Sequence, residues 1–132
     1  MRALLDVNVI IALLDSGHVM HASARTWLER NLNEGWATCP LTQTGVVRIM
    51  AQPAYPNQQP AQQVVARLAE ACGHSSHTFW PQQISLLQEG LIRWERILGP
   101  RQITDAYLLA LAVAHSGRLV SFDQRIEPQQ VP

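Results

Sequence analysis

The 132-residue sequence contains no lysine, so all ten of its basic residues are arginines. Ten acidic residues balance them, and a net charge of zero is by itself no sign of a nucleic-acid-binding surface. The arginine bias either reflects the base composition of a genome or serves phosphate binding, for which the guanidinium fork is suited. The lack of lysine also removes the Gly-Lys pair of a P-loop, which excludes that nucleotide-binding site.

Cysteine is scarce as well, because Cys39 and Cys72 are the only two and form no CxxC pair. They predict buried free thiols in a cytoplasmic protein rather than a disulfide framework. No apolar run approaches the ~20 residues that a membrane-spanning helix needs. The N-terminal segment also lacks the small-residue cleavage site of a signal peptide. The length predicts a single domain, 1–132. The lack of a long apolar run predicts that this domain does not enter a membrane.

Short apolar segments alternate along the chain with segments of helical periodicity. Strands are expected at 2–6, 36–40, 77–81 and 118–123. Helices are expected at 7–17, 21–33, 41–51, 61–73, 84–99 and 104–117, with Thr42 and Thr104 as N-caps. Because each crossover between parallel strands lays a helix on the sheet, the pattern predicts a three-layer α/β/α sandwich with a short, mainly parallel sheet.

Aspartate is rare, and three of its four occurrences fall at the ends of expected elements. Asp6 and Asp123 each close an apolar strand, and Asp105 opens the helix at 104–117. Open parallel sheets bind ligands beyond the carboxyl ends of their strands. Three carboxylates gathered there would repel one another without a cation, so Mg²⁺ or Mn²⁺ held by these acids is predicted. A cap or turn is the alternative for each aspartate alone, and Asp15 is expected to be a turn residue.

Other chemistries find less support in the sequence. Phosphoaspartyl receivers and haloacid-dehalogenase-type phosphatases also place an aspartate at a strand end, but both hold the phosphoryl group with a lysine, which this chain lacks. His18 and His21 form an HxxH pair, but two ligands do not make a zinc site, so they are expected to be capping or surface residues. The four tryptophans lie in apolar runs and are expected to pack in the core or a dimer interface rather than stack on bases.

The segments LLDVNVIIALL, CPLTQTGVVRIM and RQITDAYLLALAVAHSGRLVSFD, together with the chain length, resemble the PIN domain family. Within that family the chain resembles the VapC ribonuclease toxins of bacterial toxin–antitoxin pairs, from about Leu4 to Asp123. The resemblance implies a metal-dependent endoribonuclease acting on structured RNA of the tRNA or rRNA class. It also implies a homodimer that is neutralised by a cognate VapB-type antitoxin.

By position, Asp6, Asp105 and Asp123 match the metal-site acids of the family. Asn8 and Ser121 match the small polar residues that commonly support that cluster. The resemblance therefore implies that these five side chains form one site.

Gln43 stands where the family usually has glutamate. Its amide oxygen can still accept a hydrogen bond from a metal-bound water, but it brings no negative charge, which leaves one or two metals open. It also keeps an alternative open, a catalytically weak or inactive PIN-like domain that acts as a binding or regulatory module. A DNA-directed or structure-specific nuclease of the wider PIN group is a third reading, although such proteins are usually longer.

Two arginines are candidates for contact with RNA phosphate or with an acidic group of the antitoxin. Arg48 follows Gln43 on the helix expected at 41–51, and Arg101 precedes Asp105. A solvated or internally paired arginine is the alternative for both. The amphipathic helix at 21–33 and its neighbours are candidates for an apolar groove that takes a helix of the antitoxin.

Overall fold

Four short parallel strands form one sheet in the order β3-β2-β1-β4. The structure, a computed structural model, describes residues 1–123, and the rest of the expected domain 1–132 lies outside the described residues. The strands are β1 (Ala3–Leu5), β2 (Trp36–Thr38), β3 (His77–Phe79) and β4 (Arg118–Val120). Leu5 is paired with Val120, so the first and last strands of this sheet lie side by side.

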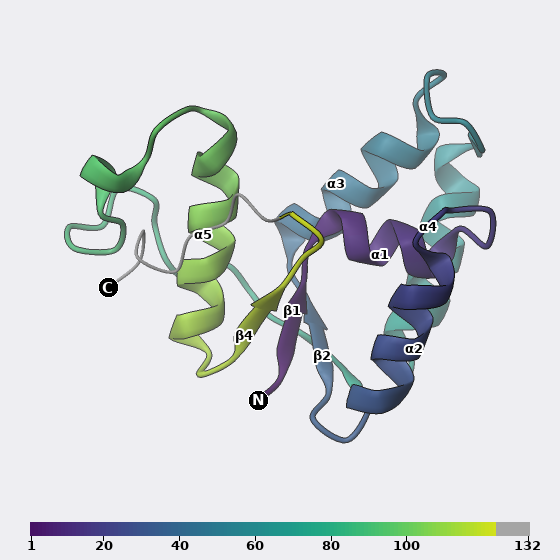
Figure 1. Ribbon diagram of the computed structural model, residues 1–132, viewed down its shortest axis with the longest axis horizontal. Helices are drawn as coiled ribbons and strands as arrows, with labels where there is room; N and C mark the ends of the chain where they lie inside the picture. The colour runs from purple at the N-terminus through teal and green to yellow at the C-terminus, as the bar shows by residue number, and fades with distance from the viewer. Residues whose placement is uncertain (124–132) are drawn as a thin grey trace.

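Five α-helices cover the two faces of the sheet (Figure 1). Figure 1 shows α1 (Val7–Leu14), α2 (His21–Asn31), α3 (Pro40–Ala51) and α4 (Ala61–Cys72) on one side of it. The helix α5 (Arg101–Ala114) lies on the other side and runs antiparallel to β4. The predicted three-layer α/β/α sandwich is confirmed.

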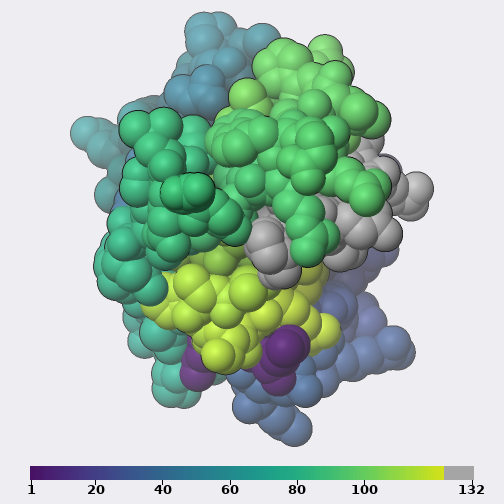
Figure 2. All heavy atoms as spheres, turned by 90° about the vertical axis from the view of Figure 1, so that its left-hand side faces the viewer, coloured from purple at the N-terminus to yellow at the C-terminus, as the bar shows by residue number. Residues whose placement is uncertain are grey.

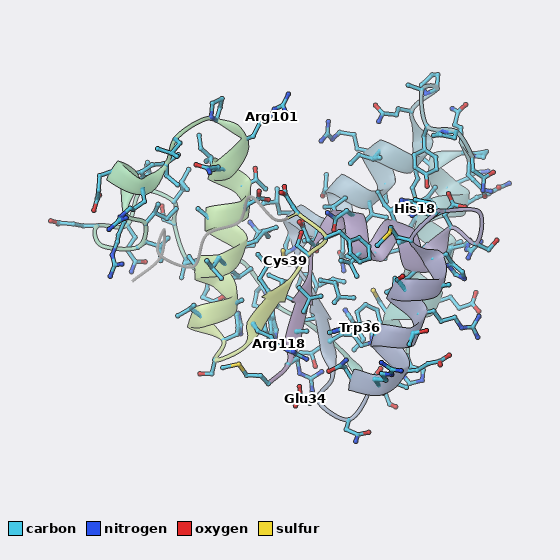
Figure 3. All side chains as sticks on the ribbon, viewed as in Figure 1. His18, Glu34, Trp36, Cys39, Arg101 and Arg118 are labelled. Atoms are coloured by element: carbon cyan, nitrogen blue, oxygen red, sulfur yellow. The ribbon has the colours of Figure 1, made fainter. Side chains whose placement is uncertain are left out.

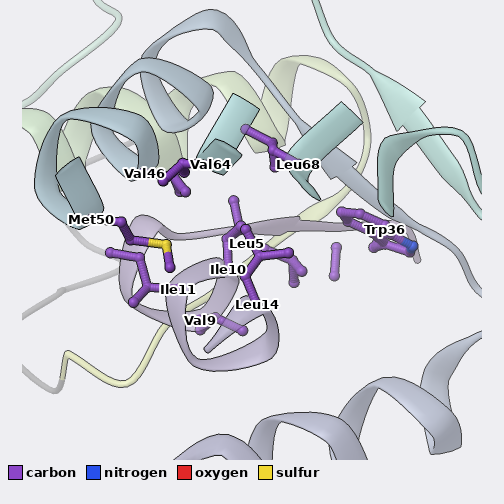
Figure 4. Packing of buried hydrophobic residues seen from close by; sticks show 11 residues of the cluster. Leu5, Val9, Ile10, Ile11, Leu14, Trp36, Val46, Met50, Val64 and Leu68 are labelled. Atoms are coloured by element: carbon purple, nitrogen blue, oxygen red, sulfur yellow. The ribbon is translucent and has the colours of Figure 1, made fainter. Parts of the chain in front are cut away.

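Both faces of the central strand β1 are buried, which explains its uninterrupted apolar sequence. Side chains alternate across a strand, so Leu5 and Trp36 face α1, α3 and α4 (Figure 4). Leu4 faces the other way and packs against Leu108 and Leu111 of α5. The strand β1 is therefore held between two separate apolar clusters, one on each side of the sheet.

The helix expected at 84–99 is wrong, because the described structure has only a three-residue 3-10 helix there, Trp94–Arg96. The apolar residues of this segment are spaced as in a helix, but Leu87 is 89% exposed and Leu98 is 84% exposed. Most helices in proteins are stabilised by burial of one continuous apolar face. In this segment Ile92 is buried, but Leu87, Trp94 and Leu98 are exposed, so no continuous face is covered. Gly90, at φ 81°, adds a backbone conformation that interrupts a helix.

Two expected N-caps are also wrong, for related reasons. The helix α3 begins at Pro40 after Cys39, and Thr42 is its third residue, whose hydroxyl accepts a hydrogen bond from the Cys39 N–H at 3.0 Å. The helix α5 begins at Arg101 after Pro100, so Thr104 lies inside it. In both places a proline, whose fixed φ suits a helix start, sets the boundary earlier than the threonine.

Several smaller expectations can be checked directly. Cys39 and Cys72 are both free thiols, Cys39 buried and Cys72 half-buried. The ring of His18 accepts a hydrogen bond from the Met20 N–H at 3.0 Å, as expected for a residue that caps a turn. Within residues 1–123, the helices are all too short or too polar to cross a bilayer.

Candidate active site

Asp6 lies directly after β1 and is the N-cap of α1. Its main-chain N–H continues the sheet by donating to the Val120 carbonyl at 2.9 Å. Its carboxylate oxygen Oδ1 accepts a hydrogen bond from the Val7 N–H at 2.8 Å. Aspartate is a preferred N-cap because it satisfies a free N–H of the first turn. The strand end and the helix start thus fix Asp6 at the carboxyl edge of the sheet.

Ser121 connects the segment after β4 with the start of α1 at this edge. Its hydroxyl donates to Asp6 Oδ2 at 2.7 Å and accepts from Asn8 Nδ2 at 3.4 Å. It also accepts from the Asp123 N–H at 2.9 Å, and the Phe122 N–H donates to Asn8 Oδ1 at 3.3 Å. Four residues expected to form the site, Asp6, Asn8, Ser121 and Asp123, therefore share one hydrogen-bonded group.

Asp105 reaches the same edge by a different route. Because α5 runs antiparallel to β4, its first turns lie at the end of the sheet where the strands finish (Figure 1). Asp105 is the fifth residue of α5 and is half-buried. In the part of the chain that the structure describes, no three His, Cys, Asp or Glu side chains are grouped to hold a metal ion. The three-acid metal site therefore stays a prediction.

Gln43, on α3, is hydrogen-bonded to β2 rather than to the group around Asp6 and Ser121. Its Nε2 donates to the hydroxyl of Thr38 at 3.0 Å, and that hydroxyl lies 2.8 Å from Nε2 of His77. Thr38 is fully buried. Sequence reasoning missed Thr38, which contacts Gln43, and His77, which contacts Thr38, although a hydroxyl at the end of a buried apolar strand is a signal that a polar partner is present.

Both candidate arginines are exposed. Arg101 projects from the start of α5, beyond the carboxyl end of the sheet (Figure 3). Arg48 lines a mainly apolar groove of about 510 Å³ between α3 and α4, which also contains Gln43 and Cys72. The two guanidinium groups are thus accessible to a phosphate ligand, one from each layer.

The other buried aspartate, Asp15, closes α1 and has a different environment. Its carboxylate accepts hydrogen bonds from the Tyr55 hydroxyl, from Asn57 Nδ2 at 3.0 Å and from the Gly17 N–H at 3.0 Å. Burial raises the pKa of Asp15, but these hydrogen bonds and the nearby His18 outweigh it and hold the pKa below its usual value. The expected turn residue is confirmed.

The donor atoms at the sheet edge fit a hard divalent cation. Asp6, Asp105 and Asp123 offer carboxylate oxygens, the ligand type that Mg²⁺ and Mn²⁺ prefer. Mg²⁺ commonly keeps several waters and uses one or two carboxylates, so it does not require three acids in contact. The hydrogen bonds from Val7 and Ser121 hold the Asp6 carboxylate in one orientation, as partners of metal ligands commonly do.

The sequence profile of the PIN domain matches residues 3–129. This chain belongs to the PIN domain family. It is 49% identical over 132 residues to Ribonuclease VapC44 of Mycobacterium tuberculosis, covering the whole chain and 93% of that relative. It is 40% identical over 124 residues to Ribonuclease VapC39 of the same organism, covering 93% of this chain and 89% of that one. The expected VapC type of PIN domain is confirmed.

Solved structures agree with this fold. VapC20 of M. tuberculosis, a toxin that cleaves the sarcin–ricin loop, superposes with a TM-score of 0.67 at 14% identity, over 92% of this chain and 89% of that chain. VapBC2 of Rickettsia felis, solved with a DNA fragment from its promoter, superposes with a TM-score of 0.66 at 16% identity, over 99% and 96%. At these identities the likeness concerns the fold alone.

Proposed function

We propose that this PIN domain is a metal-dependent endoribonuclease toxin that hydrolyses phosphodiester bonds of structured RNA, of the tRNA or rRNA class, in the cytoplasm. Its relatives named Ribonuclease VapC support the reaction class. The observation that carries the proposal is the hydrogen bond from Ser121 to Asp6, which ties the acid after the first strand to the end of the last.

The site residues have separate roles in this proposal. Asp6, Asp105 and Asp123 would hold Mg²⁺ or Mn²⁺, directly or through water. When bound, such an ion neutralises charge on the phosphate and activates the attacking water. Ser121 and the Val7 N–H keep the Asp6 carboxylate from rotating, and Asn8 supports Ser121.

The exposed arginines bind the substrate in this proposal. Arg48 and Arg101 donate to RNA phosphates on either side of the scissile bond, because a guanidinium can contact two phosphate oxygens at once. An acidic segment of the antitoxin would compete for the same two side chains.

A VapB-type antitoxin is the proposed partner of the groove between α2 and α4. This groove, of about 660 Å³, has an apolar floor that includes Leu14, Leu28 and Trp36. Arg25, Glu29, Arg67 and Glu70 line it as well and offer charges of both signs to the polar face of a helix. An amphipathic partner helix needs such an apolar cleft with polar edges.

We also propose a homodimer. The segment 81–100 and α5 form a continuous surface (Figure 2) that carries Leu87, Trp94, Leu98 and Val113 as exposed large apolar side chains. Exposed apolar side chains that gather on one surface favour association with another chain.

The first prediction tests the reaction. Purified protein freed of antitoxin is incubated with total cellular RNA in Mg²⁺, in Mn²⁺ or in EDTA, beside Asp6→Asn. Discrete fragments are expected with either metal, and none with EDTA or with Asp6→Asn. Asparagine caps a helix as well as aspartate does, so the variant removes the charge but keeps the hydrogen bond from Val7.

Glu29→Gln is the matched control, because it removes one negative charge from an exposed side chain of α2. It is expected to cleave as the wild type does. Thermal unfolding of all three proteins checks that they fold equally. Cleavage by Asp6→Asn, or equal cleavage in EDTA, would contradict the proposal.

A second candidate function is a binding or regulatory module without catalysis. The engagement of Gln43 with Thr38 favours it, because the amide nitrogen is held by Thr38 and residue 43 adds no negative charge to the acids. Mn²⁺ binding measured by calorimetry, combined with no RNA cleavage by folded protein, would support this candidate over the nuclease.

A further inference from the structure

A row of hydrogen bonds crosses the interior from α3 to α4. Gln43 Nε2 lies 3.0 Å from the Thr38 hydroxyl, which lies 2.8 Å from His77 Nε2. The main chain of Cys72 also hydrogen-bonds the His77 ring and favours its protonated form, as only a carbonyl acceptor can. The row therefore joins three elements, α3, β2 and α4, to the first residue of β3.

The direction of the hydrogen bonds in this row follows from its two ends, the donating Gln43 amide and the accepting Cys72 carbonyl. The Cys72 carbonyl accepts only, so His77 gives one ring N–H to it. In a neutral imidazole the other nitrogen is then an acceptor, and it takes the hydroxyl proton of Thr38. The Thr38 oxygen is left with lone pairs, so it needs a donor, which the amide of Gln43 supplies.

A carboxylate at position 43 could not take this place. Glutamate has no proton to donate, so Thr38 would turn its hydroxyl toward the acid and leave His77 Nε2 without a donor. His77 would then need a second proton in order to donate to Thr38. The two bonds of Thr38, with residue 43 and with His77, would both be reversed, whereas the bond from His77 to the Cys72 carbonyl would keep its direction. A negative charge would then lie at one end of the row and an imidazolium at the other.

We propose that Thr38 and His77 are positioning residues that hold Gln43 as the donor at one end of this row, directed toward β2 rather than toward Asp6. In this arrangement an amide at position 43 and a neutral histidine at position 77 are a matched pair. A glutamate placed at position 43 is captured by protonated His77 through Thr38 and is not added to the acids at the sheet edge.

The surroundings of His77 favour its neutral form. Burial lowers the pKa of His77, the positive charge of Arg2 lowers it further, and the Cys72 main chain opposes both. The ring also lies 4.6 Å from the ring of Trp36, between centroids, so one face contacts an apolar partner. The charge that acts on the His77 ring, that of Arg2, is therefore positive.

The second prediction measures the coupling. The pKa of His77 is followed by NMR of its ring protons in the wild type, in Gln43→Glu and in the pair Gln43→Glu with Thr38→Val. Gln43→Glu is expected to raise the pKa of His77 by about one unit, a tenfold gain in proton affinity, because an opposite charge is now bonded through Thr38. Removal of the Thr38 hydroxyl is expected to abolish most of that rise.

Gln63→Glu is the matched control, because it makes the same change at an exposed position of α4. It is expected to leave the pKa of His77 unchanged. Titration does not depend on nuclease activity, so it separates this proposal from the proposed function. An unchanged pKa in Gln43→Glu, or an equal rise with and without Thr38, would overturn the proposal.

Discussion

Two buried aspartates lie at opposite ends of α1, Asp6 at its start and Asp15 at its end. Asp15 receives three hydrogen bonds, two of them from Tyr55 and Asn57 in the segment between α3 and α4. Asp6 receives one from the main chain and one from Ser121. Asp15 thus fastens a loop to α1, whereas the hydrogen bonds of Asp6 orient a carboxylate at the sheet edge.

The third prediction concerns the hydrogen bond from Tyr55 to Asp15. Tyr55→Phe is expected to reduce the free energy of unfolding by about 1.5–3 kcal/mol, the usual range for a hydrogen bond to a charged group. It is also expected to raise the pKa of Asp15, since that hydrogen bond holds it down. Urea unfolding at neutral pH and under acidic conditions measures both effects.

Tyr107→Phe is the control for this substitution. Its hydroxyl donates to a neutral acceptor, the Ile84 carbonyl, at 2.8 Å. We expect a smaller loss of about 0.5–1.5 kcal/mol that does not change between neutral and acidic pH. A loss in Tyr55→Phe no larger than this, with the same acid dependence as the wild type, would contradict the assigned role of Asp15.

At the scale of elements, the connection from α5 to β4 is closely packed at Gly117. A Cβ placed on this residue would lie 2.5 Å from the ring of Trp80 and 2.6 Å from the Arg2 carbonyl oxygen. The Trp80 ring is itself stacked on His115, with centroids 4.4 Å apart. A Cβ would therefore clash with main chain as well as with the Trp80 ring, so the entry to β4 requires a residue without a side chain.

The fourth prediction is that Gly117→Ala destabilises the protein by about 1–3 kcal/mol, the usual range for overpacking. Gly99→Ala is the control, because a Cβ there meets nothing within 4 Å. It is expected to be neutral or slightly stabilising, since alanine restricts the unfolded chain. Chemical denaturation of both variants decides the matter, and equal stabilities would refute the prediction.

The sequence predicted the elements well where burial and periodicity agree. Each described strand lies within an expected range, and Asp6 directly follows β1 as expected. Asp123 lies three residues after the end of β4 rather than at the strand end itself. The segment 84–99 misled because helical spacing says nothing of whether a face is covered. The contact between Thr38 and His77 was out of reach because it joins residues 39 positions apart.

At the scale of the whole molecule, His77 and Asp15 make the stability of the fold depend on pH in the same direction. The pKa values of His77 and Asp15 are lower in the folded protein than in a free chain. The unfolded chain therefore binds more protons, and stability rises with pH. His77 contributes this rise between its folded pKa and its ordinary value of 6.5, and Asp15 contributes it below its ordinary value of 3.8.

The fifth prediction follows from the combined effect of His77 and Asp15 on stability. Urea midpoints are expected to fall as pH is lowered from 7 toward 5, and again below about 4. His77→Gln is expected to flatten the first fall and to leave the second. A stability that is constant between pH 5 and 7 in the wild type would show that burial does not hold His77 in its neutral form.

The pairing of the first strand with the last has a consequence for synthesis. Chains emerge from the ribosome N-terminus first, so β1 and Asp6 appear long before β4 exists. Until residue 121 has emerged, the Asp6 carboxylate lacks the hydroxyl that orients it, a partner 115 residues away. A chain that ends before β4 therefore lacks the hydrogen bond that orients the Asp6 carboxylate, and the proposed site can assemble only after most of the chain has been synthesised.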